Sequence, residues 1–137
     1  MIGLIKLHIV ASYLYNFKKC KDHDISIGYA YGASSLAVSF FIMEVLIITF
    51  EALGKSELID KYIIFGNGLS FGILYCGVLI VEVAFIKLTT NFLQLVKEFS
   101  DLDYLKRNLG IIYIGPVLLL GAILLVLTVI TAPDISG

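Results

Sequence analysis

Long apolar runs, interrupted by few charged residues, dominate the pattern of this chain. Three of these runs cover residues 27–53, 63–86 and 109–132. Each is long enough to cross a membrane, because roughly 20 apolar residues in a helix span a hydrocarbon core of about 30 Å. The third run carries no charge and is followed by Pro133 and Asp134, which are typical of a helix end. The pattern therefore predicts three transmembrane helices.

The first 17 residues are also apolar, but this run is short. Polar residues recur along it at close to helical spacing, namely Lys6, His8, Ser12, Asn16 and Lys19. An amphipathic helix in the membrane interface shows such a polar face, and a short fourth span is the alternative. The expected fold class is therefore all-α: a single domain, residues 1–137, forming a bundle of three or four transmembrane helices.

Residues 88–108, between the second and third runs, show the periodicity of an amphipathic helix. The apolar positions at helical spacing are Phe92, Leu95, Val96, Phe99, Leu102 and Leu105, and charged residues such as Lys97, Glu98 and Asp101 fill positions between them. A helix of this kind lies on the membrane surface or docks on a partner protein. We expect the surface position.

Basic residues are distributed unevenly around the apolar runs. Lysines precede the first run, and Lys87, Lys97, Lys106 and Arg107 follow the second. The positive-inside rule places Lys18–Ser26 and Lys87–Asn108 in the cytoplasm, and Gly54–Tyr62 and the C-terminus outside. We expect an integral protein of the plasma membrane in this orientation.

Composition narrows the classes of function. Of the 137 residues, 59% are hydrophobic and 15% charged, and the net charge is −1. A soluble domain has about 45–50% apolar and about 25% charged residues. A near-neutral chain gives no reason to expect a nucleic-acid partner. The sequence also lacks a nucleophile–base arrangement, a phosphate-binding glycine loop and a zinc spacing. We therefore expect no catalytic residues, no cofactor and no metal site, and no enzymatic activity of this chain alone.

Three polar side chains within the predicted spans are candidates for a functional role: Glu44, Asn67 and Glu82. An intramembrane carboxylate is costly when charged and unpaired, so it is protonated, partnered or in contact with water. The helical rise places Glu44 and Glu82 roughly 17 Å apart in depth, too far to share a proton. Asn67 falls near the depth of Glu44, where an amide–carboxyl hydrogen bond would satisfy both. The carboxyl groups either anchor helices, which we favour, or form stations of a proton or cation path.

Small residues recur at every fourth position in two of the predicted spans. They are Gly68, Gly72 and Cys76 in the second span and Gly28 and Gly32 in the first. Such stripes let helix backbones approach closely in lipid, so both are candidate packing faces. In the third span Pro116 removes a backbone hydrogen bond, and we expect a helix kink there.

Together these features favour a non-catalytic accessory subunit of a membrane complex. Its role would be assembly and stabilisation through helix packing with other membrane protein subunits in the lipid bilayer, and bioenergetic or redox complexes are the commonest home for such a chain. The alternative is a small homo-oligomeric channel or transporter for protons or cations that uses Glu44 and Glu82. A third interpretation is a membrane immunity or regulatory protein.

Overall fold

The computed structural model describes residues 1–59 and 68–131, and all secondary structure in these two ranges is helical. The helices are α1 (Ile2–Cys20), α2 (His23–Ala52), α3 (Ser56–Ile59), α4 (Gly68–Thr89), α5 (Phe92–Ser100), α6 (Asp103–Arg107) and α7 (Leu109–Thr131). Within the described ranges, α2, α4 and α7 are long and apolar enough to span a membrane. The described parts of the three predicted spans are thus confirmed as helices of that kind, and α1 is not among them. Residues 63–67 of the second predicted span and residue 132 of the third lie outside the described residues.

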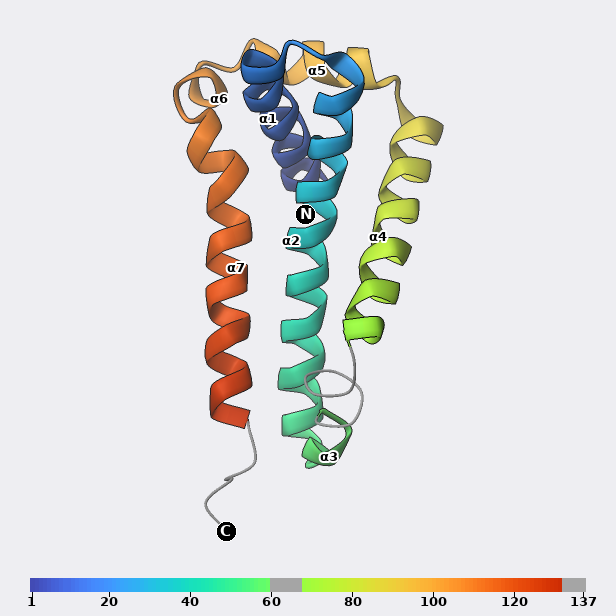
Figure 1. Ribbon diagram of the computed structural model, residues 1–137, viewed down its shortest axis with the longest axis vertical. Coiled ribbons are helices and arrows are strands. Elements are labelled where there is room, and N and C mark those ends of the chain that lie inside the picture. Colours follow the sequence, from blue (N-terminus) through green and yellow to red (C-terminus); the bar gives the residue numbers. More distant parts are fainter. Residues whose placement is uncertain (60–67, 132–137) are drawn as a thin grey trace.

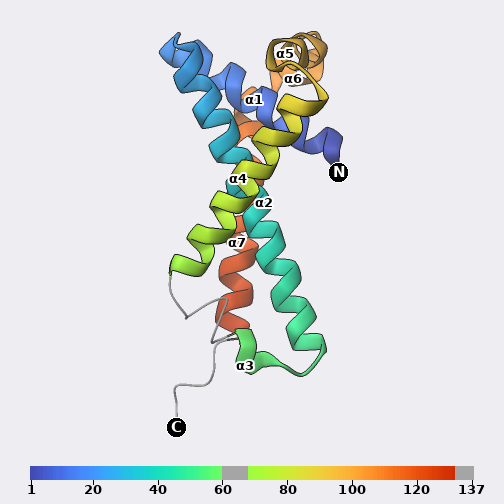
Figure 2. The ribbon, with the colours of Figure 1, turned by 90° about the vertical axis from the view of Figure 1, so that its right-hand side faces the viewer.

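The centre of the molecule is α2, with α4 and α7 on either side of it (Figure 1). Both outer helices pack on α2 but share hardly any contact with each other. In the side view, α1 runs obliquely across the first half of α2, and α4 crosses α2 at a steep angle (Figure 2). The α1 helix packs on both α2 and α7. Contacts through α2 and α1 therefore hold the bundle together.

A tight turn at residues 21–22 joins α1 to α2. Lys21 ends α1 in the left-handed conformation, with φ of 53°, and its N–H donates to the carbonyl of Phe17. Asp22 then begins α2, and its carboxylate accepts a hydrogen bond from the Ile25 N–H at 3.0 Å. This side-chain cap satisfies one of the donors that every helix leaves free at its N-terminus.

The left-handed residue in this turn gives a first testable prediction. Lys21→Gly is expected to raise the free energy of unfolding by about 1 kcal/mol, because glycine adopts positive φ without the steric cost that a β-carbon brings. Lys18→Gly is the matched control, since Lys18 is an exposed lysine inside α1. There glycine should lower the same free energy by about 1 kcal/mol. Denaturant unfolding in detergent micelles measures both, and destabilisation by Lys21→Gly would contradict the turn geometry.

Residues 88–108, predicted as one amphipathic helix, form the end of α4 followed by the two short helices α5 and α6. Asn91 caps the start of α5 with its side chain, and Leu102 is extended between α5 and α6. Asparagine and aspartate compete with helical hydrogen bonding and favour caps, which explains the breaks at Asn91 and at Asp101–Asp103. The amphipathic pattern survives the break, because α5 buries Leu95 and α6 buries Leu105.

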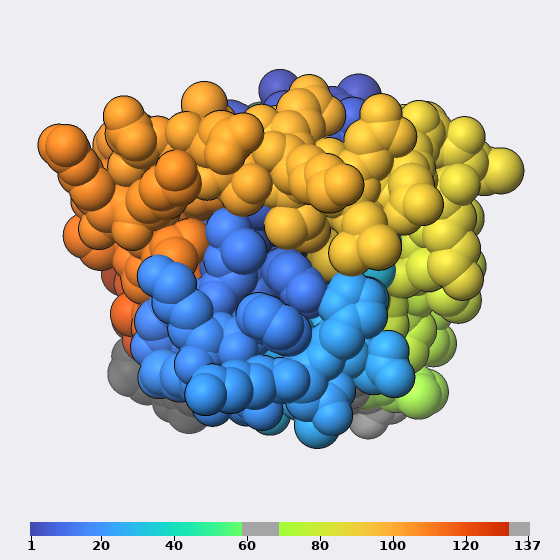
Figure 3. Space-filling view, turned by 90° about the horizontal axis from the view of Figure 1, so that it is seen from above, coloured from blue at the N-terminus to red at the C-terminus, as the bar shows by residue number. Residues whose placement is uncertain are grey.

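The two basic segments lie at one end of the molecule. Both α5 and α6 are at the same end as the α1–α2 turn, whereas α3 and the last residues of α2 and α7 are at the other (Figure 1). Seen from that first end, α5 and α6 cover one side and the α1–α2 turn covers the other (Figure 3). The fold therefore places Lys18–Ser26 and Lys87–Asn108 at the same end of the molecule. The prediction that both segments lie on one side of the membrane requires such an arrangement.

Candidate functional site

Glu82 of α4 is held by two consecutive serines of α2. Ser34 Oγ donates to Glu82 Oε1 at 3.0 Å, and Ser35 Oγ donates to Glu82 Oε2 at 2.9 Å. All three side chains are buried, and Glu82 is 8% exposed. Each carboxyl oxygen thus accepts a hydrogen bond, which is how a carboxylate is satisfied away from water. We call this arrangement the serine clamp; it fastens α4 to α2.

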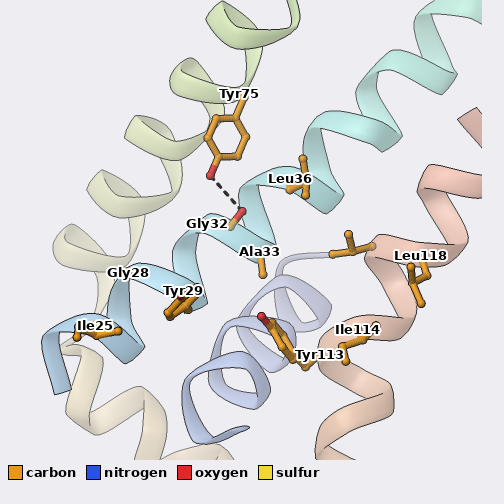
Figure 4. A pocket seen from close by; sticks show the side chains of 11 residues that line it. Ile25, Gly28, Tyr29, Gly32, Ala33, Leu36, Tyr75, Tyr113, Ile114 and Leu118 are labelled. Carbon is orange, nitrogen blue, oxygen red and sulfur yellow. Dashed lines mark hydrogen bonds between the residues drawn. The ribbon is translucent and has the colours of Figure 1, made fainter. Parts of the chain in front are cut away.

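Two aromatic residues extend the contact between α2 and α4 beyond the serine clamp. The Tyr75 hydroxyl donates to the carbonyl of Gly32 at 3.4 Å (Figure 4). Further along, the rings of Phe40 and Phe71 stack with their centroids 5.7 Å apart. Helix α4 therefore meets α2 through Phe71, Tyr75 and Glu82, which lie on one helix face because they are four and seven residues apart.

The small-residue stripe predicted on α4 lies on a different face of that helix. A Cβ added at Gly72 would meet no neighbouring atom of residues 1–59 and 68–131 within 4 Å, and Cys76 is exposed. Gly68 is the first residue of α4. On α2, a Cβ at Gly28 also meets open space, whereas one at Gly32 would lie 3.3 Å from the Tyr75 hydroxyl oxygen. Gly32 is therefore the predicted small residue where α2 and α4 approach each other closely.

A groove lies on α2 between α4 and α7 (Figure 4), with a volume of about 670 Å³. We call it the tyrosine groove, because Tyr29, Tyr75 and Tyr113 line it together with the small residues Gly28, Gly32 and Ala33. Its remaining lining is aliphatic, from α2 and α7. The groove is open, and at this level it separates α4 from α7.

Glu44 lies on α2, nine residues after Ser35, and is 6% exposed. Its Oε1 is buried and has no hydrogen-bond partner among residues 1–59 and 68–131. Asn67, the partner predicted from the sequence, lies outside the described residues. Nine residues make about two and a half helical turns and a rise of about 13 Å, which places Glu44 and Ser35 on opposite faces of α2. The structure therefore does not bring Glu44 and Glu82 together.

A buried histidine ties α1 to α7. His8 Nε2 lies 2.8 Å from the carbonyl oxygen of Tyr113. Because a carbonyl only accepts, this nitrogen carries the hydrogen and donates it. Tyr113 is three residues before Pro116, which lies inside α7 and has no N–H to donate. The contact thus supports α7 at the turn that the proline weakens. His8 was not a candidate site residue at the sequence level, and its one signal was a polar residue in an apolar run.

The contact at His8 gives a second prediction. His8→Phe removes the donor and is expected to lower the free energy of unfolding by about 1 kcal/mol. His8→Gln keeps an amide N–H on a side chain of similar length and should retain most of that stability. Far-UV circular dichroism follows the unfolding in micelles, since the chain has no tryptophan. An equal loss in both variants would show that the hydrogen bond contributes nothing.

Aromatic contacts tie the α1–α2 turn to α5. The Tyr13 hydroxyl lies 2.8 Å from His23 Nδ1, and its ring meets Phe92 edge-on with centroids 5.2 Å apart. Burial raises the pKa of the Tyr13 phenol, so the hydroxyl stays protonated. Nearby, Lys19 Nζ donates to the Tyr15 hydroxyl at 2.8 Å, and this hydrogen bond raises the pKa of the Lys19 ammonium.

Residues 1–59 and 68–131 contain no group of three or more His, Cys, Asp or Glu side chains placed to hold a metal ion. Comparisons with protein-family models, curated proteins and solved structures find no match to this chain. A proposal for the function must therefore rest on the arrangement of the helices and on the polar contacts between them.

Proposed function

We propose that this chain is a non-catalytic subunit of a larger integral membrane complex and that it stabilises the complex by packing against helices of other subunits. The observation that carries this proposal is the separation of α4 from α7, which pack on α2 but hardly on each other. Within the chain, only 11% of the most apolar stretch of α4 and 6% of that of α7 is buried. A helix of another subunit in the tyrosine groove would contact α2, α4 and α7 at once.

The chemistry of the tyrosine groove suits a helix of this kind. Small residues at its floor allow close backbone approach, which drives association where lipid is as apolar as the side chains. Tyrosine hydroxyls on its walls offer hydrogen bonds to the incoming helix, as interfacial tyrosines commonly do. The groove therefore combines a packing surface with a few polar groups that select a partner.

The proposed orientation follows from the charges. We place the basic end, with Lys18–Ser26 and Lys87–Asn108, in the cytoplasm, and α3 and the C-terminus outside the plasma membrane. In that orientation α5 and α6 lie on the cytoplasmic membrane surface, where their buried leucines face the bundle and their charged side chains face water.

A proton or cation path through this chain has less support. Each oxygen of Glu82 already accepts a hydrogen bond from a serine of the same chain, and Glu44 is on the face of α2 opposite to Ser35. A path would need further polar groups between them. We therefore favour anchoring of helices as the role of the intramembrane carboxyl groups.

The proposal is tested by purifying the tagged chain from its native membrane in a mild detergent and identifying co-purifying proteins by mass spectrometry. Other membrane subunits are expected in stoichiometric amounts. In Gly28→Leu, the new Cβ meets no neighbouring atom of the described residues within 4 Å, so the side chain fills the tyrosine groove. Recovery of those subunits should fall about tenfold, the equivalent of about 1.4 kcal/mol. Gly72→Leu, outside the groove, is the matched control. Recovery of the chain alone as a defined oligomer would overturn the proposal.

A further inference from the structure

A second groove, also about 670 Å³ in volume, lies between α1, α2 and α4. We call it the charged groove, because its lining is apolar except for Lys6 of α1 and Glu82 of α4. The N-terminal half of α1 forms one wall, where this helix runs across α2 towards α4 (Figure 2). The other walls come from residues such as Val38 of α2 and Phe85 of α4.

The two charges in this groove are not paired with each other. No ion pair joins the Lys6 ammonium to the Glu82 carboxylate, although the structure describes both side chains. The serine clamp supplies one hydrogen bond to each Glu82 oxygen, and a carboxylate can accept about four. Lys6 is half-buried and offers three donors. A groove with one anionic and one cationic side chain is complemented by a ligand that carries a cationic group for Glu82 and an anionic group for Lys6.

The shape of the groove indicates the rest of the ligand. Its α4 wall extends from Ile86, near the basic end, to Ile73, a distance of about 20 Å at the helical rise. One leaflet of a hydrocarbon core is about 15 Å thick. The groove therefore has the length and the apolar lining to hold one acyl chain of a lipid, with Glu82 in the half nearer the basic end.

We propose that the charged groove binds a single phospholipid with an ethanolamine headgroup. The primary ammonium donates hydrogen bonds to Glu82, the phosphate pairs with Lys6, and one acyl chain lies along α4 towards Ile73. Glu82 is seven residues from the end of α4, about 10 Å below it. Charged side chains at such depth draw headgroups inwards by local thinning of the bilayer, which brings the headgroup to them.

This chemistry predicts selectivity between headgroups. A choline headgroup carries the same charges, but its nitrogen has no hydrogen to donate to a carboxylate. A glycerol headgroup has the phosphate and no cation. Since hydrogen bonds to a charged group are the stronger ones, the ethanolamine lipid should bind most tightly of the three.

The test uses the full chain in mild detergent with equal amounts of phosphatidylethanolamine, phosphatidylcholine and phosphatidylglycerol of identical acyl chains. Native mass spectrometry counts the lipid that each protein molecule retains. We expect one ethanolamine lipid, retained about tenfold over the choline lipid, a ratio equivalent to about 1.4 kcal/mol. Equal retention of all three lipids, or preference for the glycerol lipid, would overturn the proposal.

Two substitutions test which group of the lipid is bound by Glu82 and which by Lys6. Glu82→Gln should reduce the ethanolamine lipid to the level of the choline lipid, and Lys6→Gln should reduce the retention of both. Glu98→Gln and Lys97→Gln, on exposed positions of α5, are the matched controls and should change nothing. Lys6 is not part of the serine clamp, so Lys6→Gln tests the site even if Glu82→Gln loosens α4. Unchanged selectivity and retention in both groove variants would also overturn the proposal.

Discussion

Replacing Ser34 and Ser35 together with alanine is expected to lower the free energy of unfolding by about 3 kcal/mol. Each serine donates to one oxygen of a buried carboxylate. A hydrogen bond to a charged group contributes about 1.5–3 kcal/mol, and an unsatisfied buried charge adds its own desolvation cost. The measurement is reversible unfolding in mixed micelles of a mild detergent and dodecyl sulfate.

Two further variants separate the serine clamp from a general loss of polarity. Ser39→Ala removes an equally buried hydroxyl, but this one bonds to the carbonyl of Ser35 in its own helix and should have little effect. Glu82→Leu in the double-alanine background should restore much of the stability, because it removes the stranded carboxyl group. The clamp has no energetic role if Ser39→Ala costs as much as the pair, or if Glu82→Leu restores nothing.

Gly32→Leu is the second change with a large expected effect, a loss of about 2–3 kcal/mol in the free energy of unfolding. A Cβ at this position already lies 3.3 Å from the Tyr75 hydroxyl, so a branched side chain must displace the Tyr75 ring or push α4 away from α2. The same change at Gly28 meets open space and should stay within about 0.5 kcal/mol. Thermal unfolding of both variants in micelles measures the difference.

The contact with Tyr75 can be isolated in turn. In Gly32→Ala, the one neighbouring atom of the described residues closer than 4 Å to the new methyl group is the Tyr75 hydroxyl oxygen. Adding Tyr75→Phe removes that atom, so the double variant should be no less stable than Tyr75→Phe alone. Equal destabilisation by leucine at Gly28 and Gly32 would mean that the spacing of the two glycines matters and not the approach of α4.

The spans themselves were predictable from the sequence, because the length of an apolar run with few charged residues is tied to membrane thickness. Helix α7 covers residues 109–131 of the third predicted span, and the first predicted span, 27–53, differs from α2 mainly at its start. There the polar residues before Ile27 belong to the first turn of α2, which Asp22 caps. The single helix predicted over 88–108 is divided, because asparagine and aspartate near both ends of α5 favour caps over helix interior.

The partners of the polar residues were not predictable in the same way. The sequence shows Ser34, Ser35 and Glu82, but their meeting depends on the crossing angle and the register of α2 against α4. In a soluble helix the apolar stripe marks the inward face. Here the lipid-facing sides are as apolar as the buried ones, so no stripe distinguishes them. For the same reason, the small residues at Gly72 and Cys76 did not reveal that α4 packs on α2 through Tyr75 and Glu82.

The serine clamp has a consequence for how the chain enters the membrane. A charged side chain near the middle of a helix costs about 2.5–3.5 kcal/mol when that helix is inserted alone. Ser34 and Ser35 are synthesised before Glu82, so their hydroxyls are already present when α4 leaves the ribosome. Helix α4 therefore partitions into lipid more readily as the second arm of a hairpin with α2 than by itself. The order of synthesis, with the hydroxyl donors first and the carboxylate after them, therefore favours insertion of α4 beside α2.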